Sequence, residues 1–325
     1  MLRYVLKRLL ALIPIVLGVT FIVFTLLYFS PGDPAVQALG ATATEEQRNE
    51  WRDAQGLNDP FFKQFFNYCE KVFLHGDLGT SYSSGQSISR ELITRFPISA
   101  KLALFAIIFD FVFGTPIGIL SAIKRYTWQD NLLMVIALIF VSIPQFWLGL
   151  ELSVIFALRL RLLPPGGLYG AKYYILPVVT LAISGVASAA RMTRSCMLDV
   201  ISQDYITTAK AKGVSEQGIT YKHALKNALI PVITQIGGAA AAMIGGAVVI
   251  ELVFSIPGMG SYISSAIKAQ DYPVVLGSVV VLSVFSSLIL LVTDLAYAAV
   301  DPRIKAQFSG GKTKKTAEKA KPSAE

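Results

Sequence analysis

The sequence is poor in the residues from which catalytic and metal sites are built. It has two cysteines and two histidines among 325 residues, and their positions match neither a zinc site nor a thiol redox site. The phosphate-binding pattern GxxxxGK followed by Ser or Thr does not occur, so the usual cradle for ATP is missing. HExxH and GxSxG are missing too, which weighs against an intramembrane protease. We therefore predict no enzymatic activity and no cofactor or metal bound by the chain itself.

Charged residues are also scarce: they make up 15% of the chain, against 54% hydrophobic residues. Only helices and closed barrels can span lipid, and long continuous apolar runs are helices. We therefore predict an all-α polytopic membrane protein with six transmembrane helices. The six apolar windows, each near the 20 residues needed to cross a bilayer, are Leu9–Phe29, Ile98–Ile123, Leu132–Ala157, Tyr174–Ala190, Pro231–Val253 and Val274–Ala298.

The distribution of Lys and Arg predicts which loops are cytoplasmic. Most of the 29 basic residues fall in segments that share one side if both termini are inside, as the positive-inside rule requires. The formal charge of +8 is divided among separate segments, which favours membrane topology over nucleic-acid binding. The first window is longer than a signal-peptide core, and we expect it to remain as an anchor. The predicted divisions are an N-terminal transmembrane helix (1–30), an extracytoplasmic helical segment (31–97), a permease domain (98–300) and a basic, disordered cytoplasmic tail (301–325).

The organising feature of the sequence is a polar island at 199–231, between long apolar runs. It contains two short helical patterns separated by Gly213, a residue that readily takes the left-handed conformation that ends helices. Ser215 is a candidate N-cap for the second pattern, and Pro231 is expected in the first turn of the next apolar helix. Ile206 and Ala209 fall on one side of the first pattern, while Lys210 and Lys212 face water.

Short helices are marginal alone, so this pair needs something to pack against. Four small residues, Ala209, Ala211, Ala224 and Ala228, would let the pair lie close in a groove of another protein. The alternative is an ordinary loop between membrane helices. A connection of this length without a role is uncommon.

Two runs within the island, DYITTAKAKG and HALKNALIP, resemble the cytoplasmic coupling motif, or EAA loop, of ATP-binding-cassette importer permeases. The resemblance is strongest to the dipeptide, oligopeptide and nickel type. Gly213 matches the central glycine of that motif, and Ala209 and Ala211 match its alanine pair. PGDP at 31–34 and SIPQFWLG at 142–149 also resemble this subfamily. The resemblance implies a type I importer fold. The positions that it assigns to ATPase coupling are Asp204, Tyr205, Ala209, Lys210, Ala211, Lys212, Gly213, His223, Ala224, Leu225, Asn227 and Pro231.

The resemblance also implies partners and a location. Two ATP-binding-cassette subunits would bind ATP and Mg²⁺, an extracytoplasmic binding protein would deliver the substrate, and a second similar permease would complete a heterodimer in the lipid bilayer. The membrane would be the plasma (inner) membrane of a bacterium or archaeon. Di- and oligopeptides are favoured as substrates over nickel or another small solute.

Several residues are candidates for the translocation pathway. Asp110 lies near the middle of the second window, where a carboxylate is costly and signals a functional role by default; a satisfied structural contact is the alternative. Small residues recur every four positions in the fifth window, either for static packing or for a sliding contact between two permeases. The candidates are Asp110, Gly238, Ala242, Gly246, Glu251 and a parallel series at Gly237, Ala241 and Gly245.

Two further features bear on mechanism. Pro116 and Pro144 are candidate kinks in helices that must tilt. In the extracytoplasmic segment, Thr44 and Gln47 predict a capping box, and Asp59-Pro60 predicts the start of an aromatic-rich helix. Its rings would meet a delivery protein, or pack on the membrane helices and at the interface.

Two other classes of function compete with an ATP-driven importer. An ion-coupled secondary transporter would need coupling-ion ligands at broken helices, for which Asp110 alone is thin support. A membrane enzyme would need a catalytic constellation, and the sequence holds none.

Overall fold

The computed structural model describes residues 2–300, apart from the side chains of residues 2–4, 7, 244, 246 and 296–300. The predicted tail at 301–325 lies outside these residues. The described part is helical, and its one β-type contact is an isolated bridge between Thr80 and Ser87. The helices are α1 (Leu2–Tyr28), α2 (Pro34–Leu39), α3 (Glu45–Ala54), α4 (Phe61–Cys69), α5 (Ile88–Phe109), α6 (Thr115–Ile123), α7 (Trp128–Ser142), α8 (Gln145–Leu152), α9 (Lys172–Ile201), α10 (Asp204–Ala211), α11 (Leu225–Val253), α12 (Met259–Lys268) and α13 (Tyr272–Val300), with π-helical segments at Glu70–Leu74, Asp110–Gly114, Ser153–Arg159 and Gly218–Ala224.

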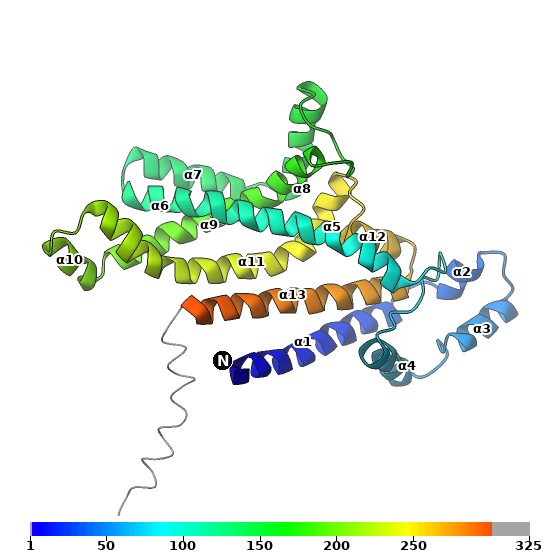
Figure 1. Ribbon diagram of the computed structural model, residues 1–325. Helices are drawn as coiled ribbons and strands as arrows, with labels where there is room; N and C mark the ends of the chain where they lie inside the picture. The colour runs from blue at the N-terminus through cyan, green and yellow to red at the C-terminus, as the bar shows by residue number, and fades with distance from the viewer. Residues whose placement is uncertain (1, 301–325) are drawn as a thin grey trace, which may run out of the picture.

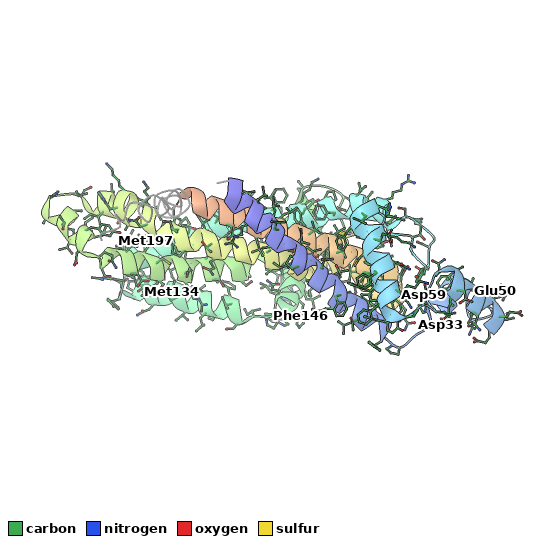
Figure 2. The ribbon with its side chains drawn as sticks, turned by 90° about the horizontal axis from the view of Figure 1, so that it is seen from below. Asp33, Glu50, Asp59, Met134, Phe146 and Met197 are labelled. Atoms are coloured by element: carbon green, nitrogen blue, oxygen red, sulfur yellow. The ribbon has the colours of Figure 1, made fainter. Side chains whose placement is uncertain are left out.

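The long helices run side by side along one direction (Figure 1). Four are long and apolar enough to cross a membrane, and two bent helix pairs raise the number to six if each pair forms one span. The predicted all-α polytopic class is therefore confirmed. Asp33, Glu50 and Asp59 lie at one end of the molecule, and Met134 and Met197 lie toward the other (Figure 2).

The third span is broken at Pro144, where the helix pair bends by 101°. Proline has no backbone N–H and pushes the residue before it into extended geometry. Ile143 accordingly adopts φ −76° and ψ 127°. The predicted kink at this proline is confirmed.

The second span begins at Ile88, ten residues before the predicted start, and continues to Ile123 as one apolar helix of 36 residues. The helix remains continuous past Pro116, and a π-helical turn lies just before it. The neighbouring glycines serve close packing against α9. A Cβ on Gly114 would lie 2.7 Å from the Cβ of Ala189, and one on Gly118 would lie 2.5 Å from the Cβ of Thr193.

The fourth span is longer than predicted. The expected window ended at Ala190, but α9 continues to Ile201. Arginine favours helices, so the helix continues beyond the apolar window, and the guanidinium of Arg194 pairs with a buried carboxylate on α7. The first residues of the predicted coupling loop, from Asp199, are thus the last turn of a long helix.

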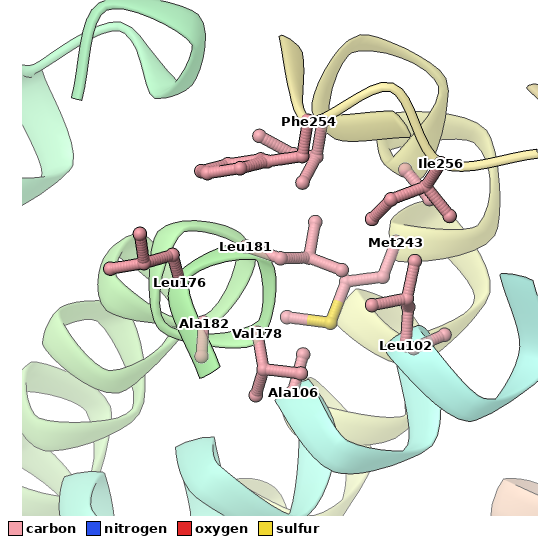
Figure 3. Close-up of a cluster of buried hydrophobic side chains, with 12 residues drawn as sticks. Leu102, Ala106, Leu176, Val178, Leu181, Ala182, Met243, Phe254 and Ile256 are labelled. Carbon is pink, nitrogen blue, oxygen red and sulfur yellow. The ribbon is translucent and has the colours of Figure 1, made fainter. Parts of the chain in front are cut away.

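The largest apolar cluster joins α5, α9, α11 and the loop that follows α11 (Figure 3). Leu102, Leu181 and Ile250 are at most 1% exposed there. Met243 fills the space between Leu102 and Val178 in the same cluster (Figure 3). These three helices therefore form a packed frame around which the others are arranged.

The segment between α1 and α5 follows the predicted local chemistry. Thr44 and Gln47 form the capping box of α3. The helix expected after Pro60 is α4, continued by a π-helical turn to Leu74.

Asp271, one residue before α13, is 2% exposed. Its carboxylate accepts hydrogen bonds from the Oγ atoms of Ser81 (2.5 Å) and Ser83 (2.7 Å) and from the backbone N–H groups of Tyr82 and Ser83.

Candidate coupling surface and translocation site

The first helix of the polar island, α10, ends at a glycine-dependent cap. Gly213 has φ +78°, a left-handed conformation that other L-residues adopt at a cost. The N–H of Gly213 donates to the carbonyl of Lys210 at 2.9 Å, and that of Val214 donates to the carbonyl of Ala209 at 3.2 Å. These two bonds form a Schellman motif. The predicted stop at Gly213 is confirmed.

The second helix of the island begins after Ser215, as predicted. The Oγ of this serine accepts a hydrogen bond from the N–H of Gly218 at 3.2 Å, which satisfies one unpaired donor of the first turn. The helix then passes through the π-helical segment at 218–224 directly into α11. Pro231 is therefore inside a continuous helix, and its predicted place in a first turn was wrong. The missing N–H is tolerated there because the helix is held by packing on both sides of it.

One face of this helix pair is buried in the chain itself. Ile206 is 1% exposed and Ala209 is 9% exposed, as the pattern predicted. Ala224 and Ala228 belong to a core cluster with residues of α6 and α9. The expectation that these alanines contact a groove of another protein was wrong for Ala209, Ala224 and Ala228. Only Ala211 of the four is exposed. Small side chains at the other three positions let the pair lie close against its own membrane helices.

The opposite face is left open. Asp204, Lys210, Lys212 and Gly213 are exposed, and Tyr205 is 44% exposed. The surface formed by these residues and Ala211 is called the coupling surface below. It projects beyond the ends of the long helices at the α10 end of the molecule (Figure 1).

The two helices of the island are also connected by polar contacts. The amide of Asn227 donates to the Oη of Tyr205 at 3.0 Å and to the carbonyl of His223 at 3.1 Å. The ammonium of Lys210 lies 3.9 Å from the carboxylate of Glu216. His223 and Leu225 are half-buried, and Leu225 packs on the apolar cluster shared with α6 and α9. The pair is thus a connected unit whose movement would be passed to α9 and α11.

A buried ion pair ties this unit to the rest of the bundle, and sequence reasoning missed it. Asp130, at the start of α7, is 0% exposed. Both of its oxygens accept hydrogen bonds from Arg194 of α9 at 2.7 Å, and Ser121 and the N–H of Tyr126 donate to it as well. Four donors compensate the buried charge. No local pattern marks this pair, because its two members are 64 residues apart.

Asp110 is buried where the second span packs against α9, and it is 1% exposed. The carboxyl group lies against the backbone at Gly185, where any Cβ would collide with it. The Oδ1 atom has no hydrogen-bond partner among the described residues. In this structure Asp110 therefore contacts a neighbouring helix of its own chain.

The small residues of α11 divide into two sets. A Cβ on Gly237 would collide with the side chain of Thr293 on α13, so this glycine permits close helix packing within the chain. Gly238, Ala242 and Gly245 are exposed, and a Cβ on Gly238 or Gly245 would meet no atom within 4 Å. Ala241 is half-buried, and the side-chain surroundings of Gly246 lie outside the described residues.

Glu251, near the end of α11, is fully buried. One oxygen accepts from the Oγ of Ser99 at 2.5 Å, and the other accepts from the N–H of Ser261 at 2.9 Å. The Oγ of Ser99 also accepts a hydrogen bond from the N–H of Met259. Glu251 thus fastens the loop between α11 and α12 to α5. A cavity of about 370 Å³, lined by Arg95, Glu251 and Tyr262 among others, adjoins this contact.

The described residues form one further large cavity, and they contain no cluster of metal ligands. A cavity of about 840 Å³ lies among α1, α4 and the start of α13, far from the coupling surface. Within residues 2–300, no group of three or more His, Cys, Asp or Glu side chains is placed to hold a metal ion.

Comparisons with known proteins agree with these features. Residues 114–306 match the family model described as binding-protein-dependent transport system inner membrane component, and residues 1–103 match the model of the N-terminal part of such membrane components. The chain is 40% identical to the dipeptide transport system permease protein DppB of Alkalihalophilus pseudofirmus, over 94% of this chain and 100% of that protein. It is 42% identical to the glutathione transport system permease protein GsiC of Salmonella typhimurium, over 94% and 99%.

A solved structure shares the fold. The MetNI methionine ABC transporter in an inward-facing conformation matches with a TM-score of 0.53 and 20% identity, over 65% of this chain and 96% of that one. At this level of identity, the likeness concerns the arrangement of helices alone.

Proposed function

The chain belongs to the family of binding-protein-dependent transport system inner membrane components, and we propose that its coupling surface is where an ATPase subunit docks and drives it. The chain is a multi-pass membrane permease subunit of a peptide importer and is not itself an enzyme. It works with an ATPase and a binding protein. The finer mechanism below is our proposal.

The observation that carries the proposal is the two-sided character of the α10 helix pair. On one side, Ile206, Ala209 and Ala224 are buried within the chain. On the other side, Lys210 and Lys212 are exposed. A partner that pushes on the open side moves α9 and α11 together, because both continue directly from the island. Alternating access then follows from tilting of these helices, with the break at Pro144 as one flexing point.

The partners are proposed in the numbers that the resemblance implies. Two ATPase subunits bind ATP and Mg²⁺, so the chain itself holds no nucleotide. A second, similar permease completes a heterodimer, and the exposed small residues Gly238, Ala242 and Gly245 of α11 support a close contact there. The binding protein meets the opposite end of the molecule, where α2, α3 and α4 lie.

We place the coupling surface and both termini in the cytoplasm of a bacterial or archaeal cell, at its plasma membrane, because the basic loops favour that orientation. The substrates proposed are di- and oligopeptides. The relatives named above transport a dipeptide and glutathione, and glutathione is itself a small peptide. The cavity beside Glu251 lies at the end of the molecule away from the coupling surface, where a delivered peptide would arrive.

Two measurements test the proposal. In vesicles containing the complete transporter, uptake should stop with an ATPase unable to hydrolyse ATP and should continue with an ion uncoupler. In the same assembly, Lys212→Cys should crosslink to the ATPase. Lys268→Cys, at another exposed lysine, on α12, should not. Uptake that follows the ion gradient, or crosslinking from position 268 alone, contradicts the assignment.

A further inference from the structure

Helix α4 and its π-helical continuation have three distinct faces. Phe61, Phe65 and Tyr68 point toward α1, where their rings contact those of Phe21 and Phe24 at centroid distances of 5.2 to 6.3 Å. This face confirms that part of the aromatic-rich helix packs onto a membrane helix.

A second face is apolar and uncovered. Phe62 is 63% exposed and Phe66 is 65% exposed. These residues are four positions apart and therefore share one side of the helix. Phe73 and Leu74 are also exposed in the continuation. An uncovered row of large apolar side chains marks a surface that meets something other than water.

The third face is polar and lies roughly opposite the exposed rings. Gln64, Asn67 and Lys71 line the 840 Å³ cavity together with Asp33 and Arg52. On a helical wheel of 3.6 residues per turn, Gln64 and Lys71 fall about half a turn from Phe62. Helix α4 therefore separates a polar compartment from an apolar surrounding.

The position of α4 along α1 indicates what this surrounding is. Phe61 touches Tyr28 and Phe29 at the end of α1, at 5.0 and 6.4 Å, and Phe65 touches Phe21. At 1.5 Å per residue, these contacts cover about the last 10 Å of the helix. An amphipathic helix that lies on a membrane sinks to a depth of about 5–10 Å at the headgroup boundary. With the end of α1 at the headgroup boundary, these contacts put α4 within this range of depth.

The orientation agrees with the depth. Helix α4 is seen end-on in Figure 1 while α1 runs across the same view, and the two axes again cross in Figure 2. A helix seen end-on where a transmembrane helix runs across the view is steeply inclined to that helix, and it therefore lies close to the plane of the membrane (Figure 1). The exposed ring of Phe62 contacts Phe61 at 5.2 Å, and Phe61 contacts the exposed Phe29 at the end of α1 at 6.4 Å, so the uncovered apolar surfaces of α4 and α1 meet.

We propose that α4 and the segment to Leu74 form an in-plane anchor at the membrane interface beside the C-terminal end of α1, with Phe62 and Phe66 inserted among lipids. Lys63 lies about 100° around the helix from Phe62 and its ammonium is paired with Asp59 at 2.9 Å, while Asn67 and Lys71 line the polar cavity. Residues 34–54, which form α2 and α3, are called the α2–α3 lobe. The anchor holds this lobe and the polar cavity at a fixed height above the bilayer. A docking protein is the competing occupant of the exposed rings, but their continuity with α1 favours lipid.

Nitroxide scanning of the reconstituted transporter tests this placement. In a background with Cys69→Ser and Cys196→Ala, labels are attached to Phe62→Cys and Phe66→Cys, with Lys63→Cys and Asn67→Cys as matched controls. The vesicles contain phosphatidylethanolamine and phosphatidylglycerol. The measured quantity is the ratio of collisions with oxygen, which concentrates in lipid, to collisions with a water-soluble nickel complex. We expect a ratio shifted toward oxygen at positions 62 and 66 and toward nickel at positions 63 and 67.

Equal ratios at the four positions would overturn the proposal. So would nickel accessibility at 62 and 66 that disappears only when the binding protein is added, because those rings would then be a protein docking site. The unmodified chain provides a second measurement that no folding defect can disturb. Phospholipids carrying a photoreactive group near the headgroup should crosslink within residues 61–74, and crosslinks confined to the long spans would count against the anchor.

Discussion

Arg194 and Asp130 meet through two parallel hydrogen bonds, Nε to Oδ1 and Nη2 to Oδ2, both of 2.7 Å. Asp130 belongs to the turn that begins α7, and Arg194 lies two turns before the end of α9. The pair therefore fixes the helix that leads into α10 to the neighbouring hairpin. It is a joint between the coupling surface and the bundle.

Removing one member of this pair should destabilise the protein strongly. Arg194→Ala leaves a buried carboxylate without its cation, and breaking such pairs costs about 3–5 kcal/mol, near the lower end here because Arg194 is partly exposed. Thermal unfolding of the solubilised transporter should show a lower midpoint for Arg194→Ala. The double variant Asp130→Asn with Arg194→Gln should recover part of the loss, and a double variant less stable than Arg194→Ala would contradict the pairing.

Gly213 should be required for its backbone conformation rather than for space. A Cβ at this position would meet nothing within 4 Å, so Gly213→Val introduces only the strain of a left-handed residue, about 1–2 kcal/mol. We expect normal membrane insertion and loss of substrate-stimulated ATP hydrolysis, with partial retention in Gly213→Asn, because asparagine tolerates this conformation.

A matched control for that variant lies at the other end of the chain. Gly56 ends α3 in the same Schellman arrangement, with φ +70° and its N–H and that of Leu57 bonded to the carbonyls of Asp53 and Arg52, and a Cβ there would make only an ordinary contact. Gly56→Val therefore carries a similar backbone strain far from the coupling surface, and stimulated hydrolysis should remain in Gly56→Val. Equal loss in both variants would mean that general instability, and not coupling, explains the effect.

Neighbouring glycines on α11 should respond differently to the same substitution. Gly237→Ala drives a methyl group into Thr293, and such overpacking costs about 1–3 kcal/mol. Gly238→Ala meets no atom of its own chain. Only the first change should destabilise the permease alone, because an alanine at an uncrowded position inside a helix is no less stable than glycine. If Gly238 faces the second permease, Gly238→Leu should weaken assembly, measured as the fraction of complete transporter recovered by size-exclusion chromatography.

Acid should loosen the α2–α3 lobe through Asp33. A hydrogen bond from Arg52 holds the pKa of this carboxyl below its usual value, with Nε to Oδ1 at 3.2 Å. Because the folded pKa is the lower one, the stabilisation is present above the unfolded value near 3.9 and is lost as the pH falls through the folded pKa. The pair is partly exposed, so the expected effect is about 0.5–1 kcal/mol.

Trp51 of α3 reports on this lobe, since its ring packs on Tyr82 at 4.9 Å. With Trp128 and Trp147 replaced by Phe, its fluorescence should change as the pH falls below 4. Asp33→Asn should remove that transition. A transition that persists in the variant would assign the acid response to another group.

The elements predicted correctly from sequence are those decided by neighbouring residues. The stop at Gly213, the cap at Ser215, the capping box at Thr44 and the break at Pro144 each depend on backbone chemistry within a few positions. Such chemistry is readable because a left-handed residue, a side-chain cap or a missing N–H acts locally.

The errors have a common cause, which is packing between distant segments. Pro231 lies inside a helix because contacts with other helices outweigh its local preference. Ala224 and Ala228 looked available to a partner but lie beneath α6 and α9. The pairing of Asp130 with Arg194 depends on which helices become neighbours, and periodicity carries no information about that choice.

The attachment of the loop at residues 81–83 to Asp271 has a mechanical consequence. This aspartate immediately precedes α13 and accepts hydrogen bonds from Ser81, Tyr82 and Ser83. A movement of α13 along its axis would therefore pull the loop with it. Movement driven by the ATPase would then reach the substrate-receiving side through α13 itself, with no flexible linker in between.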